Sequence, residues 1–234
     1  MDSIRKQAQS AGILYFLIGI TAPIGLELVP GRILVRGDAT ATAAHLRASE
    51  ALVRVGIASE LFHQAVCIFL VLALYRLFQG VSRRHAVELV VLGALVSVPI
   101  VFVNVLNEIA ALVLVGGAPF LAPFDKGQLD ALAFLFLRLH QQGITVASIF
   151  WGLWLFPFGI LVVRSGFIPR VLGLLLFIAG AGYLVAAFGL LVLPALSHAV
   201  GPVAGLLELG EIPIILWLVI WGATGPKADE PLPA

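Results

Sequence analysis

Acidic, histidine and amide side chains recur inside stretches of the sequence that are otherwise strongly apolar. Glu60 and His63 are three positions apart and Gln64 follows, so a helix would present all three on one face. Carboxylate and imidazole groups at this spacing are used by proteins to bind zinc and iron. The same residue types also carry protons across membranes, and they pair in purely structural networks. The spacing therefore marks a candidate site and leaves its chemistry open.

Residues of the same kinds interrupt the other apolar stretches. The full candidate cluster consists of Glu60, His63, Gln64, Asn104, Asn107, Glu108, Arg138, His140, Gln141, Glu208 and Glu211. Its candidate metal ligands are Glu60, His63, Glu108, His140 and Glu211, and these ligand types favour zinc or iron. Two residues of helical rotation, roughly 200°, separate His140 from Arg138, so the two side chains cannot both point into one pocket.

Membrane-spanning helices are needed to position these residues. Of the 234 residues, 61% are hydrophobic and 12% are charged, whereas a soluble domain carries roughly 25% charged residues. A helix crosses the hydrocarbon with about 20 mainly apolar residues. The sequence therefore predicts an all-α polytopic membrane bundle, organised as a single transmembrane domain over residues 1–234. The expected spans, about six in all, are 11–30, 54–79, 86–115, 130–161, 171–193 and 201–222.

Local signals indicate where helices begin and bend. Asp38 is a candidate N-cap for the alanine-rich run that follows it, and we expect this run to lead straight into the second span. Pro99 and Pro213 lie inside spans and predict local kinks, because proline removes a backbone hydrogen bond.

The placement of Lys and Arg predicts that both termini are cytoplasmic. With a cytoplasmic N-terminus, that side carries Arg5, Lys6, Arg76, Arg83, Arg84, Arg164, Arg170 and Lys227. The opposite side carries fewer, namely Arg32, Arg36, Arg47, Arg54 and Lys126. In this topology Glu108 comes late in an outward span, whereas the other charged members of the cluster come early in inward spans. The cluster is therefore predicted to lie in the outer half of the bilayer.

The charge balance of the cluster leaves several functions open. The acids of the cluster, together with Glu27, outnumber its one obligate cation, Arg138. Either some of these acids are neutral because their pKa values are raised, or the cluster binds a cation, or it is open to water. We expect a site for a polar ligand, a metal, a proton or a small cation, surrounded by membrane lipid. The alternatives are a structural or partner-binding membrane protein, whose polar network only fixes helix packing, and a metal-dependent membrane enzyme.

Composition excludes some other classes of protein. A formal net charge of +1 gives no basic face for nucleic acid. The single cysteine, Cys67, excludes an intramolecular disulfide and a cysteine zinc site.

Two stretches of the sequence resemble a known family. One runs from Gly37-Asp38-Ala39-Thr40 through Ser49-Glu50 to Gly56-Ile57-Ala58-Ser59-Glu60. The other is Arg164-Ser165-Gly166-Phe167-Ile168-Pro169-Arg170, preceded by the Leu139-His140 step. Together they resemble the bacterial integral-membrane family catalogued as domain of unknown function 4386. The resemblance covers nearly the whole chain and implies a multi-pass protein of the bacterial cytoplasmic (inner) membrane. The family brings no established activity, so it assigns no catalytic or binding residue.

Overall fold

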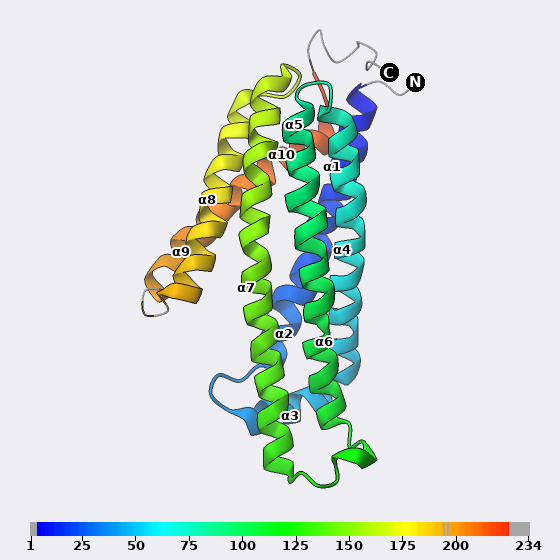
Figure 1. Cartoon of the computed structure of the whole chain (residues 1–234), viewed down its shortest axis with the longest axis vertical. Helices are drawn as coiled ribbons and strands as arrows, with labels where there is room; N and C mark the ends of the chain where they lie inside the picture. Colours follow the sequence, from blue (N-terminus) through cyan, green and yellow to red (C-terminus); the bar gives the residue numbers. More distant parts are fainter. Residues whose placement is uncertain (1–3, 194, 196, 225–234) are drawn as a thin grey trace. The chain divides into compact units, whose positions relative to one another are not determined.

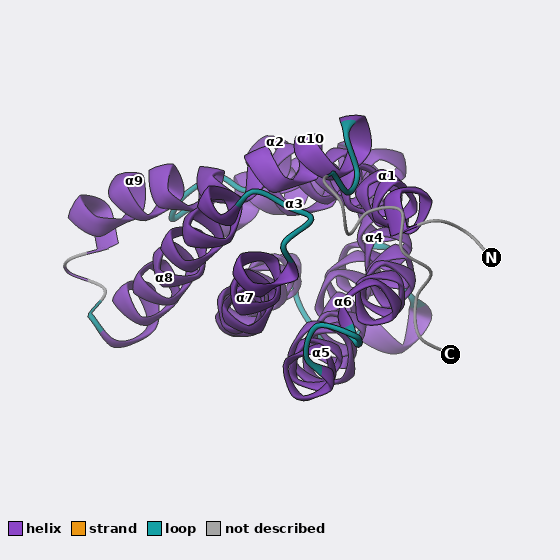
Figure 2. Cartoon of the chain, turned by 90° about the horizontal axis from the view of Figure 1, so that it is seen from above, coloured by secondary structure: helices purple, strands orange, loops and turns teal. Residues whose placement is uncertain are grey.

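The computed structural model describes residues 4–193, 195 and 197–224, and this part of the chain consists of helices joined by short loops (Figure 1; Figure 2). The labels η1 and η2 denote π-helical segments, and η3 and η5 denote 3-10 segments. In chain order the elements are α1 Ile4–Pro23, η1 Ile24–Leu28, α2 Val29–Ile33, α3 Ala39–Ala48, α4 Glu50–Phe78, α5 Arg83–Val90, η2 Val91–Val96, α6 Ser97–Val115, η3 Pro119–Leu121, α7 Lys126–Ser165, α8 Arg170–Val192, α9 Ser197–Glu208, η5 Leu209–Glu211 and α10 Ile212–Ile220.

Six helical stretches in the described residues are long and apolar enough to cross a membrane. They are Ile4–Ile33, Glu50–Phe78, Arg83–Val115, Lys126–Ser165, Arg170–Val192 and Gly201–Ile220. Each coincides with one predicted span, and most extend beyond the predicted ends because polar residues continue the helix past the apolar stretch. The prediction of an all-α, multi-pass bundle is confirmed. Lys227, which entered the prediction of orientation, lies outside the described residues.

Three of the spans contain an irregular helical turn just before a proline. Proline lacks an amide hydrogen and its ring clashes with the carbonyl of the fourth residue before it. Pro30, Pro99 and Pro213 each stand four residues after a member of η1, η2 or η5, namely Leu26, Leu95 and Leu209. The first span is therefore π-helical at η1, close to the candidate site residue Glu60. The α-helix of the last span is interrupted by the 3-10 segment η5, which contains Glu211.

The contacts of the chain divide it into two compact units, and each is described separately. Unit 1 consists of Met1–Ile18, Ala65–Pro99 and Thr145–Ala234, and unit 2 consists of Gly19–Gln64 and Ile100–Ile144. The core of unit 1 is rich in aromatic rings, with Tyr15, Trp154 and Phe158 in mutual contact. The core of unit 2 is aliphatic and contains Val29, Ile33, Leu46, Val53, Ala111, Leu112, Ala133 and Leu137. Four helices, α1, α4, α6 and α7, contribute residues to both units.

In unit 2, α3 is a separate helix and does not lead straight into α4 as the sequence suggested. Asp38 caps it as predicted, since its carboxylate accepts the amide hydrogen of Ala41 at 2.8 Å. The helix ends at Ala48, and the backbone of the next residue, Ser49 (φ −122°, ψ 28°), leaves the helical region. This break lets α3 turn and bury Leu46 in the aliphatic core.

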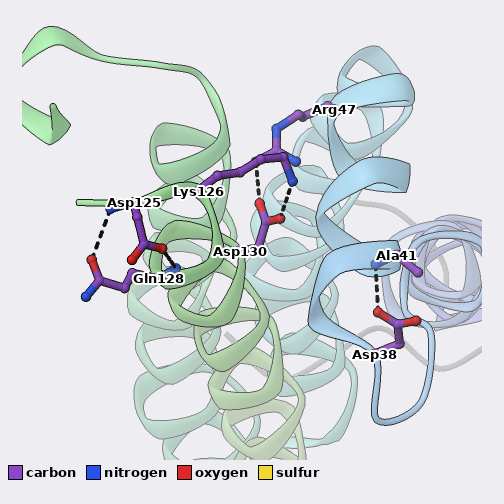
Figure 3. A network of polar contacts seen from close by, with 7 residues as sticks. All are labelled: Asp38, Ala41, Arg47, Asp125, Lys126, Gln128 and Asp130. Carbon is purple, nitrogen blue, oxygen red and sulfur yellow. Dashed lines mark hydrogen bonds and ion pairs between the residues drawn. The ribbon is translucent and has the colours of Figure 1, made fainter.

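A charged network ties α3 to the start of α7. The buried carboxylate of Asp130 accepts hydrogen bonds from Arg47 on α3 and from Lys126 on its own helix (Figure 3). Nearby, Asp125 and Gln128 exchange hydrogen bonds that cap the first turn of α7 (Figure 3). The helix that carries Arg138 and His140 is thereby fixed at its N-terminal end.

Candidate metal site

Three buried side chains from three helices of unit 2 converge on one point. They are Glu60 on α4, Glu108 on α6 and His140 on α7, with exposed fractions of 0%, 3% and 3%. The Nε2 atom of His140 lies 3.1 Å from Oε2 of Glu60 and 3.8 Å from Oε2 of Glu108. One ligand atom from each of the three residues falls within 4.8 Å of the others. These residues form what we call the Glu60 triad.

The π-helical segment η1 packs closely against α4 beside Glu60. A Cβ atom on Gly25 would lie 2.5 Å from Cγ of Glu60 and 2.9 Å from the carbonyl oxygen of Gly56, so only glycine fits there. On the same side, the Ser59 hydroxyl donates to the carbonyl oxygen of Thr21 at 2.8 Å. The Glu60 side chain is therefore confined by the backbone of the first span.

Amide side chains on α6 fix the position of the His140 backbone. The Nδ2 group of Asn104 donates to the carbonyl oxygen of His140 at 2.8 Å. The Asn107 amide in turn donates to the side-chain oxygen of Asn104 at 3.0 Å. A Cβ atom on Gly143 would lie 2.0 Å from that same Asn104 oxygen, so the glycine makes room for the bridge between the helices. Asn104 thus holds the backbone of His140 directly, and Asn107 does so through its hydrogen bond to Asn104.

Several buried polar atoms in and beside the triad lack hydrogen-bond partners among the described residues. They are Oε1 of Glu60, Oε2 of Glu108 and both amide atoms of Gln64. Gln64 is 1% exposed and lies one helical turn after Glu60. Most buried polar side-chain atoms in native proteins are paired with protein or ordered water. Two buried carboxylates beside one histidine, each with an oxygen that accepts no hydrogen bond, make this a candidate position for a ligand that is not part of the chain.

Arg138 takes no part in the triad. Its side chain is exposed, and its Nη1 group donates to Oε1 of Gln141 at 2.9 Å. His140, two residues further on, is buried, as the rotation between the two positions predicted. No ion pair between Arg138 and a glutamate is found within the described residues. His63 is buried on α4, one turn from Glu60.

The other two predicted glutamates lie in unit 1. Glu211, in η5, accepts hydrogen bonds from the hydroxyl groups of Tyr15 at Oε1 and Tyr183 at Oε2, the latter at 3.2 Å. Glu208 is half-buried at the end of α9. The two tyrosines were not predicted as site residues. A buried tyrosine needs a partner for its hydroxyl, but nothing local in the sequence links Tyr15 to a residue 196 positions away.

A pocket opens on the triad from one side. Its polar wall is formed by Glu108, His140 and Gln141. The remaining wall is apolar and comes mainly from α2, the residues that follow it and the facing helices: Val29, Pro30, Ile33, Leu34, Val53 and Leu137. The candidate metal site is thus buried but has an approach that is lined mostly by aliphatic groups.

The helices and the triad define this chain as a multi-pass membrane protein with a buried polar cluster. A family model described as "Domain of unknown function (DUF4386)" matches residues 10–222, and the chain belongs to that family. An uncharacterized protein of Archaeoglobus fulgidus is 39% identical over 79 residues, which is 34% of this chain. The match spans 46% of the archaeal protein, so this chain covers less than half of it. No solved structure matches the chain.

Proposed function

We propose that the Glu60 triad binds one divalent transition-metal ion, either zinc or iron. The observation that carries the proposal is the convergence of Glu60, Glu108 and His140, which are buried and leave one oxygen of each carboxylate without a hydrogen bond. Carboxylate and imidazole donors from separate helices of a bundle are an established way to hold such ions. Of the five predicted metal ligands, the proposal keeps these three.

Charge balance supports a cation at this position. Two carboxylates in an apolar interior are costly to ionise unless a positive charge accompanies them. Arg138 does not supply that charge, because it is exposed and hydrogen-bonded to Gln141. A divalent ion beside a neutral imidazole would cancel the charge of both carboxylates.

The number of ligands indicates what the metal does. Structural zinc sites are closed by four protein ligands, whereas catalytic sites have three and leave one position open. The triad supplies three, and the pocket beside Glu108 and His140 reaches it from one side. An open position would let the metal bind a water molecule or a small ligand and polarise it. We therefore favour a metal that acts on a bound molecule over one that only holds helices together.

We place the protein in the cytoplasmic membrane of a bacterial cell, with both termini inside and the triad in the outer half of the bilayer. The excess of Lys and Arg in the loops on the side of the termini supports this orientation. The triad would then face the cell exterior or periplasm, where the ion could be acquired.

Metal analysis of the purified protein tests the proposal. The detergent-solubilised chain is loaded with Zn²⁺, or with Fe²⁺ under anaerobic conditions, then desalted and analysed for metal. We expect one ion per chain in the wild type and a loss of that ion in His140→Gln, which keeps a polar side chain. The matched control is His45→Gln, because His45 is exposed on α3; this variant should keep its metal.

Two results would count against the metal. A folded wild-type protein that retains neither ion would leave the triad as a proton-sharing or structural cluster. Equal metal content in His140→Gln and the wild type would move the ion to another part of the chain.

A further inference from the structure

Exposed arginines gather at the helix ends on one side of unit 1. They are Arg5 at the start of α1, Arg76 near the end of α4, Arg83 at the start of α5, Arg164 at the end of α7 and Arg170 at the start of α8. None of these side chains has an ion pair or a hydrogen bond within the described residues. We call these five residues the basic end of unit 1.

Contacts between the helix ends bring the arginines to the same end of one packed unit. The turn between α7 and α8 packs against the end of α4, because the rings of Phe167 and Phe78 stack with their centroids 5.7 Å apart. The backbone amide of Thr224 donates to the carbonyl oxygen of Phe167 at 2.9 Å. Gly222 lies against the start of α1, since a Cβ atom there would be 2.7 Å from the carbonyl oxygen of Arg5.

Acidic side chains do not neutralise this end. Among the described residues of these helix ends the acid is Glu88, which already pairs with Arg84 at 3.0 Å and with His85 at 2.7 Å. Unit 2 differs, because there Arg47 pairs with the buried carboxylate of Asp130. Clustered positive charges without a counter-charge in the chain favour an anionic partner at the basic end.

Three of these arginines have an exposed aliphatic side chain four positions further into the same helix. The pairs are Arg76 with Leu72, Arg83 with Val87, and Arg170 with Leu174. The aliphatic members are 40%, 44% and 54% exposed, respectively. Residues four apart lie on one face of a helix, so each pair presents a guanidinium and, one turn deeper in the span, an apolar group. A phospholipid has the same order, with a phosphate at the membrane surface and acyl chains beneath it.

We propose that the basic end of unit 1 binds anionic phospholipids. Its arginines hold the phosphate groups, and the acyl chains lie against the exposed aliphatic residues one turn deeper. Guanidinium groups suit this task because they bind phosphate oxygens through two parallel hydrogen bonds. In the orientation proposed above, this end meets the cytoplasmic leaflet, whose anionic lipids attract basic segments. The inference is independent of the metal site, because the Glu60 triad lies in unit 2.

Lipid titrations of the detergent-solubilised full chain, followed by native mass spectrometry, test the inference. Dioleoylphosphatidylglycerol and dioleoylphosphatidylcholine have the same acyl chains and differ in net charge. We expect the phosphatidylglycerol to bind at a concentration lower by about tenfold or more. Glycerol 3-phosphate carries the phosphate without the chains, so at equal concentration it should not displace the bound lipid.

Two triple variants that remove the same charge test where the lipid binds. One is Arg76→Gln, Arg83→Gln and Arg170→Gln at the basic end, and its control is Arg32→Gln, Arg36→Gln and Arg54→Gln, at exposed positions of unit 2. The first variant should lose affinity for phosphatidylglycerol by about fivefold for each arginine removed. The control should keep the preference of the wild type. Both should fold, because all six positions are exposed, and circular dichroism checks this.

Three outcomes would overturn the inference. One is equal affinity of the wild type for the two lipids. Another is an equal loss in the two triple variants, because the preference would then follow net charge and not the basic end. The third is displacement of the lipid by an equal concentration of glycerol 3-phosphate, which would identify a site for soluble phosphate esters. Each of these results leaves the metal site unaffected, since zinc content is measured separately.

Discussion

Among the described residues, a partly buried glutamate in unit 1 and two buried glutamates in unit 2 differ in how completely their oxygens are hydrogen-bonded. In unit 1, each carboxylate oxygen of Glu211 accepts a hydrogen bond, one from Tyr15 and one from Tyr183. In unit 2, Glu60 and Glu108 share a single histidine, and one oxygen of each has no hydrogen-bond partner among the described residues. Each cluster contains a glutamate that the sequence suggested as a metal ligand.

The difference shows why a buried acid is not by itself a binding site. The Glu211 carboxylate is partly buried and accepts two hydroxyl hydrogens, so its hydrogen-bonding demand is met within the chain and it can stabilise the packing of α1, α8 and η5. Glu60 and Glu108 each retain an oxygen that accepts no hydrogen bond, and they share one imidazole, so their hydrogen-bonding demand is met only in part. Under the function proposed above, Glu211 has a structural role and the Glu60 triad binds the ligand.

The largest expected effect comes from exchanging one carboxylate for an amide in each cluster. Glu108→Gln removes a metal ligand without changing side-chain size, so bound zinc should be lost. Glu211→Gln makes the same chemical change next to Tyr15 and Tyr183 and should retain one zinc per chain. Metal analysis of the two purified variants checks both expectations. Loss of zinc from Glu211→Gln but not from Glu108→Gln would reverse the assignment of roles.

An intermediate effect is expected where the first span presses on Glu60. In Gly25→Ala the new methyl group would lie 2.5 Å from Cγ of Glu60, so that side chain must shift. Displacing a ligand in this way typically weakens metal binding by about tenfold or more. Gly31→Ala is the matched control on α2, because no atom lies within 4 Å of its added Cβ. Zinc affinities measured by competition with a chelator should separate the two variants, and equal affinities would contradict the observed packing.

The smallest expected effect concerns the tyrosines around Glu211. Tyr15→Phe leaves one carboxylate oxygen of Glu211 without its donor, which costs about 1–3 kcal/mol of stability. Tyr75→Phe removes a hydroxyl from a partly buried tyrosine packed against the same core and should change stability little. Thermal unfolding in one detergent gives the comparison, and zinc content should be unchanged in both variants. A reduced zinc content in Tyr15→Phe would mean that the two clusters are coupled.

Much of the fold could be predicted because lipid as a solvent restricts what a sequence can do. Long, mainly apolar stretches located the six candidate spans of the described residues, and Asp38 predicted the start of α3. The break after α3 could not be predicted, since it depends on the burial of Leu46 in the core of unit 2. The same limit applies to the π-helical turns, although Pro99, which follows η2, was predicted to distort its span locally.

The candidate site was predicted in part. Glu60, Glu108 and His140 fall at similar depths in consecutive antiparallel spans, which is why their convergence could be expected. Depth could not separate Glu211 from them, because the partner of a side chain depends on helix rotation and packing. Gly25, which confines Glu60, could not be identified either, because a glycine in an apolar stretch gives no indication of what packs against it.

The X-ray absorption spectrum of zinc in the loaded wild-type protein tests the central claim most directly. Coordination by the Glu60 triad predicts a first shell of nitrogen and oxygen atoms only, at about 2.0–2.2 Å, with the scattering signature of a single imidazole. A sulfur neighbour at about 2.3 Å would place the ion at Cys67. A signature of two imidazoles would likewise contradict the triad, because it contains only His140.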